Sequence, residues 1–359
     1  MLKRSIGFVL VMSIGLLFSC RDKVDNDDNT DFNKGEMLEN VSANIIIPSL
    51  MKFETEVSNL KSSFENFKSN PTNVNLDNVK TNWRESYLTF QTLKIFDFGP
   101  IRNIGFKSST GTYPVDPVKI ESNISSGGYD LAAASNIAAV GLNALDYLLY
   151  NSNALTEFQN NSSYTDYVDG VIQKMFNETQ SIVNGWVGYT TVFNESTGTS
   201  STSAFSEFVN EFNRDYELAK TAKIGFPIGK ANLGLSNPEY VEARYSGISF
   251  ELLEESIKAL KATYNGDDFE NGSTGQGFSN YLVHLERTNL DDAINEKFDL
   301  ILSNIEGFTM TLEEAIDDPA MKSQLDELYL HLQQQVVNIK TDMTAAFGVL
   351  ITYQDNDGD

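Results

Sequence analysis

The sequence has little cysteine or histidine, with one cysteine, Cys20, and two histidines, His284 and His331. A single cysteine excludes a disulfide within the chain. The histidines form neither a His-x-x-x-His nor a His-Glu-x-x-His arrangement, which excludes a standard zincin site. A serine nucleophile would need one of them as its base, and no pattern places Ser, His and Asp together. Each histidine is therefore interpreted as a helix-surface or satisfied core residue, with haem ligation as the alternative.

Basic residues are also scarce, since 26 Lys and Arg stand against 50 Asp and Glu, for a net charge of −24. Such a balance argues against partners that are themselves anionic, namely nucleic acids and anionic lipid surfaces. It favours solubility and the attraction of cations. A solvated acidic surface is the simpler reading, and a surface that concentrates cations is the alternative.

Long apolar runs are rare, and the most prominent one extends from Ile6 to Phe18, after Lys3 and Arg4. It is too short to span a membrane and matches a signal peptide ending in a lipobox. We predict a lipoprotein signal peptide over residues 1–19 and lipidation of Cys20, which would leave no thiolate for catalysis or metal binding. The alternative is an ordinary signal peptide with an incidental cysteine. Lipidation implies a membrane anchor, and we predict its location as the cell envelope of a Gram-negative-type bacterium, at the outer membrane and facing the periplasm or the surface.

Polar, acidic segments flank the rest of the chain. Residues 20–36 are rich in Asp and Asn and predict a disordered tether, of the kind that displays some lipoproteins on the cell surface. Residues 353–359 resemble the start of a calcium loop that lacks its final Glu, so an acidic tail is predicted.

Strand-like alternation is scarce between these segments, and helical periodicity dominates. The fold class is therefore predicted as all-α, with two helical bundles side by side, residues 37–200 and 201–352, joined by long ordered loops. A single larger all-α domain is the alternative. The principal helices are predicted at 37–69, 75–96, 129–150, 164–192, 204–224, 238–264, 278–287, 290–305 and 319–350.

The segment Gly141–Tyr150 places two small polar side chains, Asn143 and Asp146, three residues apart on an otherwise apolar helix. This spacing puts both on one face. Buried polar atoms need partners, so these side chains either bridge neighbouring segments by hydrogen bonds or line a site. The sequence leaves both interpretations open.

The same segment resembles the Gly-x-His-x-x-Glu signature of imelysin-like proteins, with Asn143 at the His position and Asp146 at the Glu position. That family comprises bacterial envelope lipoproteins and periplasmic proteins implicated in iron uptake and classed by sequence with metallopeptidases. The resemblance extends along most of the chain. It includes Trp83-Arg84, Tyr87, Phe96–Pro100, Tyr113–Asp116, Pro238–Glu242 with Ser246 and Ser249, and Gly277–Leu282.

The resemblance implies a metal site at the signature, yet an amide oxygen suits Ca²⁺ better than it replaces imidazole at iron or zinc. Asn143 and Asp146 are therefore predicted to hold a metal ion, iron or calcium, through oxygen. The wider ligand-binding set from the matching segments is Asn143, Asp146, Asp97, Asp116, Glu242 and Ser246. Alternatively, Asn143 and Asp146 only bridge helices, or Arg84 or Arg244 pairs with the carboxylates.

The function that the resemblance implies is a non-catalytic binding protein linked to iron or haem uptake, with its site between the two bundles. Its expected partners are iron, haem or another small ligand and an envelope transport protein, with no nucleic acid. A metallopeptidase-like enzyme and a surface interaction module are the alternatives.

Overall fold

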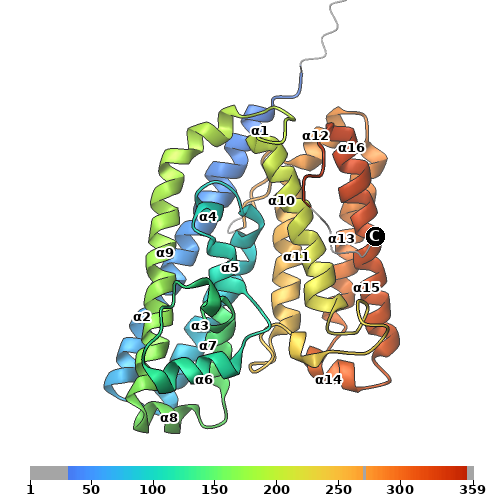
Figure 1. The fold of residues 1–359 in the computed structure, drawn as a ribbon. Helices are drawn as coiled ribbons and strands as arrows, with labels where there is room; N and C mark the ends of the chain where they lie inside the picture. The colour runs from blue at the N-terminus through green and yellow to red at the C-terminus, as the bar shows by residue number, and fades with distance from the viewer. Residues whose placement is uncertain (1–30, 270–271, 354–359) are drawn as a thin grey trace, which may run out of the picture. The chain divides into compact units, whose positions relative to one another are not determined.

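The computed structural model describes residues 31–269 and 272–353, and helices make up most of this part (Figure 1). The predicted signal peptide, Cys20, most of the tether and nearly all of the acidic tail lie outside these residues. The elements of the first half are α1 (Lys34–Asn40), η1 (Val41–Ile46), α2 (Ile47–Ser69), α3 (Asn73–Leu93), η2 (Lys94–Phe96), α4 (Pro100–Asn103), α5 (Phe106–Gly111), α6 (Pro117–Ser126), η3 (Ala134–Ala139), α7 (Gly141–Tyr150), α8 (Ala154–Asn160) and α9 (Ser162–Glu195).

The second half is helical in the same way. Its elements are α10 (Ala204–Leu218), η4 (Ala219–Gly225), η5 (Pro238–Tyr240), α11 (Ser249–Asn265), α12 (Phe278–His284), α13 (Thr288–Glu306), α14 (Leu312–Asp317), α15 (Lys322–Val336), η6 (Val337–Met343) and α16 (Thr344–Phe347). Across the described ranges the sole β pairing is an isolated bridge between Asp267 and Thr274. The all-α prediction is confirmed.

The helices pack as two groups joined through α3 and α11 (Figure 1). In the first group α2 packs against α3 and α9, and in the second α13 packs against α11 and α15. Residues from Asn33 onward form one compact unit, and the division into domains at residue 200 stays a prediction.

Apolar side chains at helical spacing explain the long helices. On α2 the side chains of Phe53, Val57, Leu60 and Phe64 are all fully buried, which is the stripe expected for a helix that packs along one face. The predicted helix 37–69 is confirmed as one run of helical turns, with the π-helical segment η1 just before Pro48.

The helix predicted from residue 129 begins later than expected. Residues 134–139 form the 3-10 helix η3, Val140 is extended, and α7 starts only at Gly141, which has a φ of +78°. An ideal Cβ on Gly141 would lie 2.4 Å from the carbonyl oxygen of Thr110 on α5. Glycine therefore allows the chain to turn into α7 directly against α5.

Three buried aromatic donors fix α7 in the first group. Trp83 Nε1 donates to the carbonyl oxygen of Leu142 at 2.9 Å, and the Tyr164 hydroxyl donates to that of Leu148 at 2.6 Å. The Tyr167 hydroxyl donates to Ala139, just before α7, at 2.7 Å. These bonds secure the helix that carries the two polar side chains of the signature segment.

The helix predicted from residue 238 also begins late. Only Pro238–Tyr240 are helical, as η5, and α11 starts at Ser249. Between them lies an irregular segment, residues 241–248, which we call the 241–248 loop. The segment 97–128, predicted from its Gly-Pro and X-Pro pairs as a loop with at most a short helix near Val118–Ile124, does contain that helix as α6, but it also contains α4 and α5, which the prediction lacks.

In the part of the chain that the structure describes, no helix combines the length and the apolar character that crossing a bilayer requires.

Candidate functional site

The polar side chains of α7 contact the 241–248 loop. Asn143 Oδ1 accepts a hydrogen bond from the backbone N–H of Ala243 at 3.2 Å, and Asn143 Nδ2 donates to the carbonyl oxygen of Gly111 at 3.4 Å. Asn143 is buried, with 3% of its surface exposed. One amide side chain thus joins α5, α7 and a loop a hundred residues further along the chain.

Asp146 binds the next part of the same loop. Its Oδ2 accepts from the N–H of Tyr245 and its Oδ1 from that of Ser246, both at 3.0 Å. Burial raises the pKa of Asp146 to about 6, although the hydrogen bonds from Ser246 and Tyr245 oppose that rise. Asn143 and Asp146 therefore join α7 to the 241–248 loop by hydrogen bonds. This is the first of the two interpretations given above, in which the polar side chains bridge neighbouring segments.

This pKa predicts how stability depends on pH. From about pH 4 to about pH 6 the folded chain keeps a proton on Asp146 that the unfolded chain releases, so this group lowers the free energy of unfolding as pH rises. A shift of this size corresponds to roughly 3 kcal/mol. The Asp146→Asn variant has no such titration.

Urea denaturation of both proteins at pH 4, 5, 6 and 7 tests this prediction. The wild-type chain should lose stability relative to Asp146→Asn across this range, because the other titrations are common to both and cancel. A pH-independent difference between the two proteins would contradict a raised pKa.

Glu242 lies beside this contact and belongs to a buried ion pair. It accepts a hydrogen bond from the Tyr87 hydroxyl on α3 at 2.9 Å and another from Lys223 Nζ on η4. Glu242 and Lys223 are each only 2% exposed. Desolvation and the nearby Glu242 carboxylate raise the pKa of Tyr87 well above its usual value, which keeps the hydroxyl protonated as a donor.

A second buried carboxylate, Asp215 on α10, pairs with two lysines. Lys94 Nζ and Lys107 Nζ each donate to one of its oxygens at 2.9 Å. Burial opposes the ionisation of Asp215, but attraction to Lys107 and Lys94 outweighs it and lowers the pKa to about 2. Desolvation lowers the pKa of Lys94 to about 8, although Asp215 partly compensates. Asp215 is thus ionised at neutral pH and holds two ammonium groups together.

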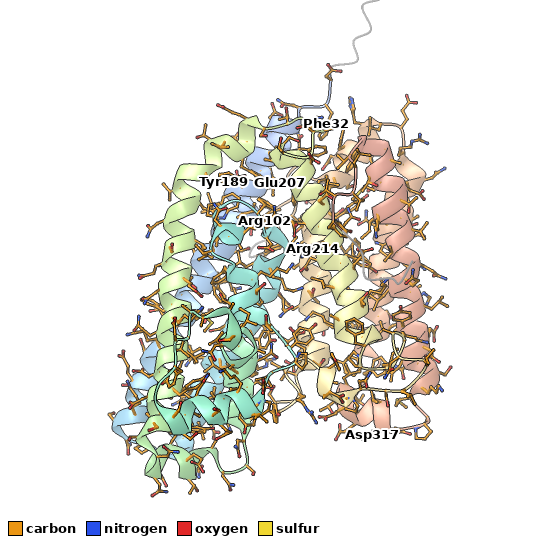
Figure 2. The ribbon with its side chains drawn as sticks, in the orientation of Figure 1. Phe32, Arg102, Tyr189, Glu207, Arg214 and Asp317 are labelled. Atoms are coloured by element: carbon orange, nitrogen blue, oxygen red, sulfur yellow. The ribbon has the colours of Figure 1, made fainter. Side chains whose placement is uncertain are left out.

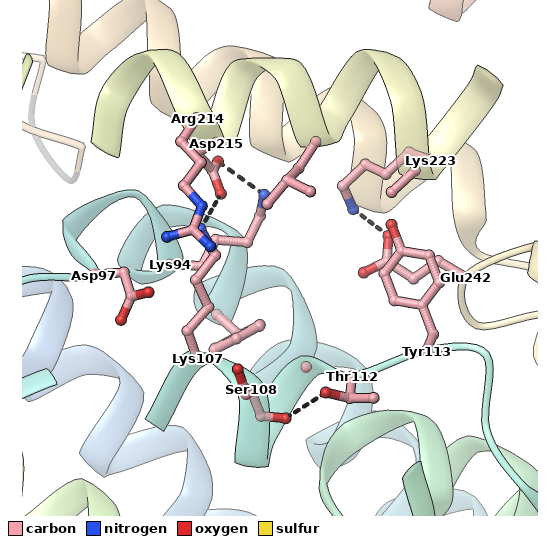
Figure 3. Close-up of a pocket in the computed structure, with 14 residues that line it drawn as sticks. Lys94, Asp97, Lys107, Ser108, Thr112, Tyr113, Arg214, Asp215, Lys223 and Glu242 are labelled. Carbon is pink, nitrogen blue, oxygen red and sulfur yellow. Dashed lines mark hydrogen bonds and ion pairs between the residues drawn. The ribbon is translucent and has the colours of Figure 1, made fainter. Parts of the chain in front are cut away.

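These two ion-pair clusters border one pocket of about 250 Å³ between the helix groups. Figure 3 shows Asp215 with its lysines on one side of the pocket and Glu242 with Lys223 on the other. The lining residues come from α3, η2, α5, α10, η4 and the loops: Phe90, Lys94, Asp97, Lys107, Ser108, Gly111, Thr112, Tyr113, Arg214, Asp215, Leu218, Ala222, Lys223 and Glu242.

A further ion-pair cluster joins α4 to α10 near this pocket. Arg102 and Glu207 lie close together (Figure 2), and Arg102 donates to Glu207 at 3.2 Å. Arg102 also donates to Glu211 at 2.7 Å. Arg214, which lines the pocket, lies 3.6 Å from Glu211. The helix that carries Asp215 is therefore also held to the first group by Arg102, whereas the Arg214–Glu211 pair lies within α10 itself.

The six predicted ligand-binding residues fall into three places. Asp97 and Glu242 line the pocket. Asn143, Asp146 and Ser246 form the contact between α7 and the loop, where the Ser246 hydroxyl donates to Ala243 at 3.1 Å. Asp116 is exposed and caps α6 by accepting from the N–H of Lys119 at 2.9 Å, so the structure does not bring it to the pocket.

The alternative partners suggested for these carboxylates are wrong. Arg84 pairs with Glu85 and Glu251, and Arg244 pairs with Glu313. Both interactions lie at partly exposed positions.

A metal ion would find few unoccupied oxygens at the signature segment. Each side-chain oxygen of Asn143 and Asp146 already accepts a backbone N–H. Residues 31–269 and 272–353 contain no group of three or more His, Cys, Asp or Glu side chains arranged to hold a metal. These residues fit a bare ion poorly, and metal binding by Asn143 and Asp146 stays a prediction.

The sequence interpretation missed Lys107, Asp215 and Lys223. The sequence does contain a hint of two of them. Asp215 and Lys223 fall at the helical spacing set by the buried apolar residues Phe208 and Phe212, so both belong to the buried face of α10 and η4. A charged residue within a buried row needs a buried partner. The sequence alone does not show which segments supply that partner.

Comparisons with known proteins agree with this architecture. The family profile described as imelysin matches residues 46–339. The proposed iron-regulated protein A precursor from Parabacteroides distasonis ATCC 8503 is similar in structure, with a TM-score of 0.72 and 17% sequence identity over 88% of this chain and 96% of that one. An imelysin-like protein from Psychrobacter arcticum 273-4 also has a TM-score of 0.72, with 14% identity over 89% of this chain and 97% of its own. The search of curated proteins found no match.

Proposed function

Because this chain belongs to the imelysin family, we propose that it is a binding protein of the cell envelope that takes part in iron acquisition. The ligand occupies the pocket between the two helix groups. One of the two structural neighbours described above is named as iron-regulated, which supports the link to iron.

The observation that carries this proposal is the convergence of the family-like segments on one pocket. Asp97 follows η2, Tyr113 lies just after α5, and Glu242 lies in the 241–248 loop, yet all three line the same cavity. Pockets at the junction of packed helices are common positions for ligand sites in helical proteins. Two buried carboxylates and their lysines make this pocket strongly polar.

The pocket size limits the ligand. Its volume of about 250 Å³ lies just below the range of roughly 300–1,000 Å³ that is usual for pockets of drug-sized ligands. A small iron-containing ligand fits this volume better than haem does.

The envelope location rests on the sequence pattern at the N-terminus. The apolar run before Cys20 supports export followed by lipidation, and lipidation anchors the chain to a membrane. A binding protein held there would pass its ligand to an envelope transport partner.

Calorimetric titration of the purified chain with ferric iron, calcium and haem, together with growth of a deletion strain under iron limitation, tests the function. We expect binding of an iron-containing ligand and slower growth of the deletion strain. The proposal is overturned when no iron-containing ligand binds and iron-limited growth is unchanged.

A matched pair of variants tests whether the pocket is the site. Asp97→Asn removes a charge from the pocket lining, whereas Asp77→Asn removes the same charge from an exposed position on α3. Only the Asp97 variant should change the affinity for the ligand. Equal effects of the two variants would argue for a site elsewhere.

The interaction module is the second candidate, and one observation favours it. The oxygens of Asn143 and Asp146 are used in holding the 241–248 loop, which is a structural role. Under that function the Asn143→Ala/Asp146→Ala double variant loses roughly 1–3 kcal/mol of stability while ligand binding is unchanged.

A further inference from the structure

The pocket carries more positive than negative groups, against the trend of the whole chain. Its lining contains four basic side chains, Lys94, Lys107, Arg214 and Lys223, and three carboxylates, those of Asp97, Asp215 and Glu242. The whole sequence has a net charge of −24. A basic excess inside a partly enclosed pocket of an acidic protein selects for an anion, because field lines concentrate in such a space.

The lysines retain hydrogen-bonding capacity after their ion pairs are formed. An ammonium group has three donors. Each of Lys94, Lys107 and Lys223 makes one hydrogen bond through Nζ to a described residue, in each case to a carboxylate. Lys94 and Lys223 are 7% and 2% exposed, so solvent reaches them little. A bound acceptor would satisfy donors that the protein itself leaves available.

The ammonium groups also repel one another. Desolvation is the main reason why the pKa of Lys94 falls to about 8, and repulsion from Lys223 and Lys107 adds to it. A negative group placed among the three lysines would offset both costs. The charges that line the pocket therefore favour an anion.

Part of the wall is apolar, which favours an organic ligand over an inorganic ion. Phe90, Leu218 and Ala222 contribute carbon surface, and Thr112 and Tyr113 contribute hydroxyl groups. The volume of about 250 Å³ exceeds what a lone phosphate or sulfate needs. In a ligand with a carbon skeleton and acidic groups, the skeleton would pack against the apolar side chains and the acidic groups would pair with the lysines.

We propose that this pocket binds a small organic anion bearing two or more carboxylates, which pair with Lys94, Lys107 and Lys223 while Arg214 closes the exposed side. The inference rests on the proposed function for taking this pocket as the ligand site. The proposed chemical class, a small organic polycarboxylate, is the same whether the anion binds alone or together with a metal ion that it chelates.

The test is calorimetric titration of the full chain with succinate and citrate in metal-free buffer at pH 7, with inorganic phosphate as the comparison. We expect at least one carboxylate to bind and phosphate to bind at least 10-fold more weakly. The absence of binding by both carboxylates, or equal affinity for phosphate, overturns the proposal.

Variants locate the site. Lys107→Gln and Arg214→Gln each remove one charge from the pocket, and Lys107→Gln leaves Asp215 paired with Lys94. Each should weaken carboxylate binding ~10-fold or more, in line with the loss of a charge-assisted hydrogen bond. The control is Lys258→Gln, which removes an equal charge from an exposed pair with Glu254 on α11 and should change affinity less than 2-fold.

An equal loss in Lys258→Gln would show that overall charge, and not the pocket, controls binding, and would overturn the proposal. Circular dichroism of each variant verifies that it is folded. Because these titrations contain no iron, their failure would leave the role in iron acquisition to the growth experiment. A failed growth experiment would likewise leave a carboxylate site intact.

Discussion

Replacement of Gly141 by Ala should lower the free energy of unfolding by roughly 3 kcal/mol or more. Two separate costs add at this position. The φ of +78° lies in the left-handed region, which L side chains rarely adopt. The new Cβ would also lie 2.4 Å from the carbonyl oxygen of Thr110 and 2.7 Å from that of Ser109. Both atoms belong to the backbone of α5, so the clash cannot be relieved by a rotamer change.

Gly127→Ala is the matched control. Gly127 also has a positive φ, +65°, but a Cβ there would meet no atom within 4 Å. Its replacement should cost roughly 1 kcal/mol, the left-handed penalty alone. Urea denaturation of the two variants separates the costs. Equal losses of unfolding free energy in the two variants would mean that α5 can move away from Gly141 without cost. The close approach of α5 to α7 would then not contribute to stability.

Replacement of Asp215 by Asn should cost roughly 3–5 kcal/mol, because it leaves two lysines without their carboxylate. Lys94 is buried and Lys107 largely so, and the two ammonium groups would repel each other across a neutral amide. The expected readout is a lower denaturation midpoint in urea at pH 7.

Two further proteins test this explanation. Adding Lys94→Met to Asp215→Asn should recover part of the loss, since it removes the more deeply buried of the unpaired charges. Glu251→Gln breaks a comparable ion pair with Arg84 at an exposed position and should cost less than ~1 kcal/mol. A loss in Asp215→Asn as small as that control would show that water reaches the lysines.

Much of the fold follows from local patterns in the sequence. The helix over residues 37–69 is predictable because Phe53, Val57 and Leu60 repeat at helical spacing, and helical periodicity is a local property. The start of α7 was predicted about a dozen residues too early. It depends on the conformation of Gly141 and on the proximity of α5, and neither has a periodic signature.

The candidate site was only partly predictable for the same reason. Asn143, Asp146, Glu242 and Asp97 were identified from polar residues in the family-like segments, and Glu242 and Asp97 do line the pocket. The pairing of Asp215 with Lys94 and Lys107 was not predicted. It joins positions 121 and 108 residues apart, and only the packing of the two helix groups brings them together.

The hydrogen bonds that Asp146 accepts from the 241–248 loop connect positions 99 and 100 residues apart along the chain. Closing so long a loop costs chain entropy, so we expect these contacts to form after local ones. We therefore expect the first helix group to gain native structure before Glu242 is held in place. A newly folding chain would complete its pocket only after the 241–248 loop has docked, and a fragment that ends before residue 241 would lack Glu242, the partner of Lys223 in the pocket wall.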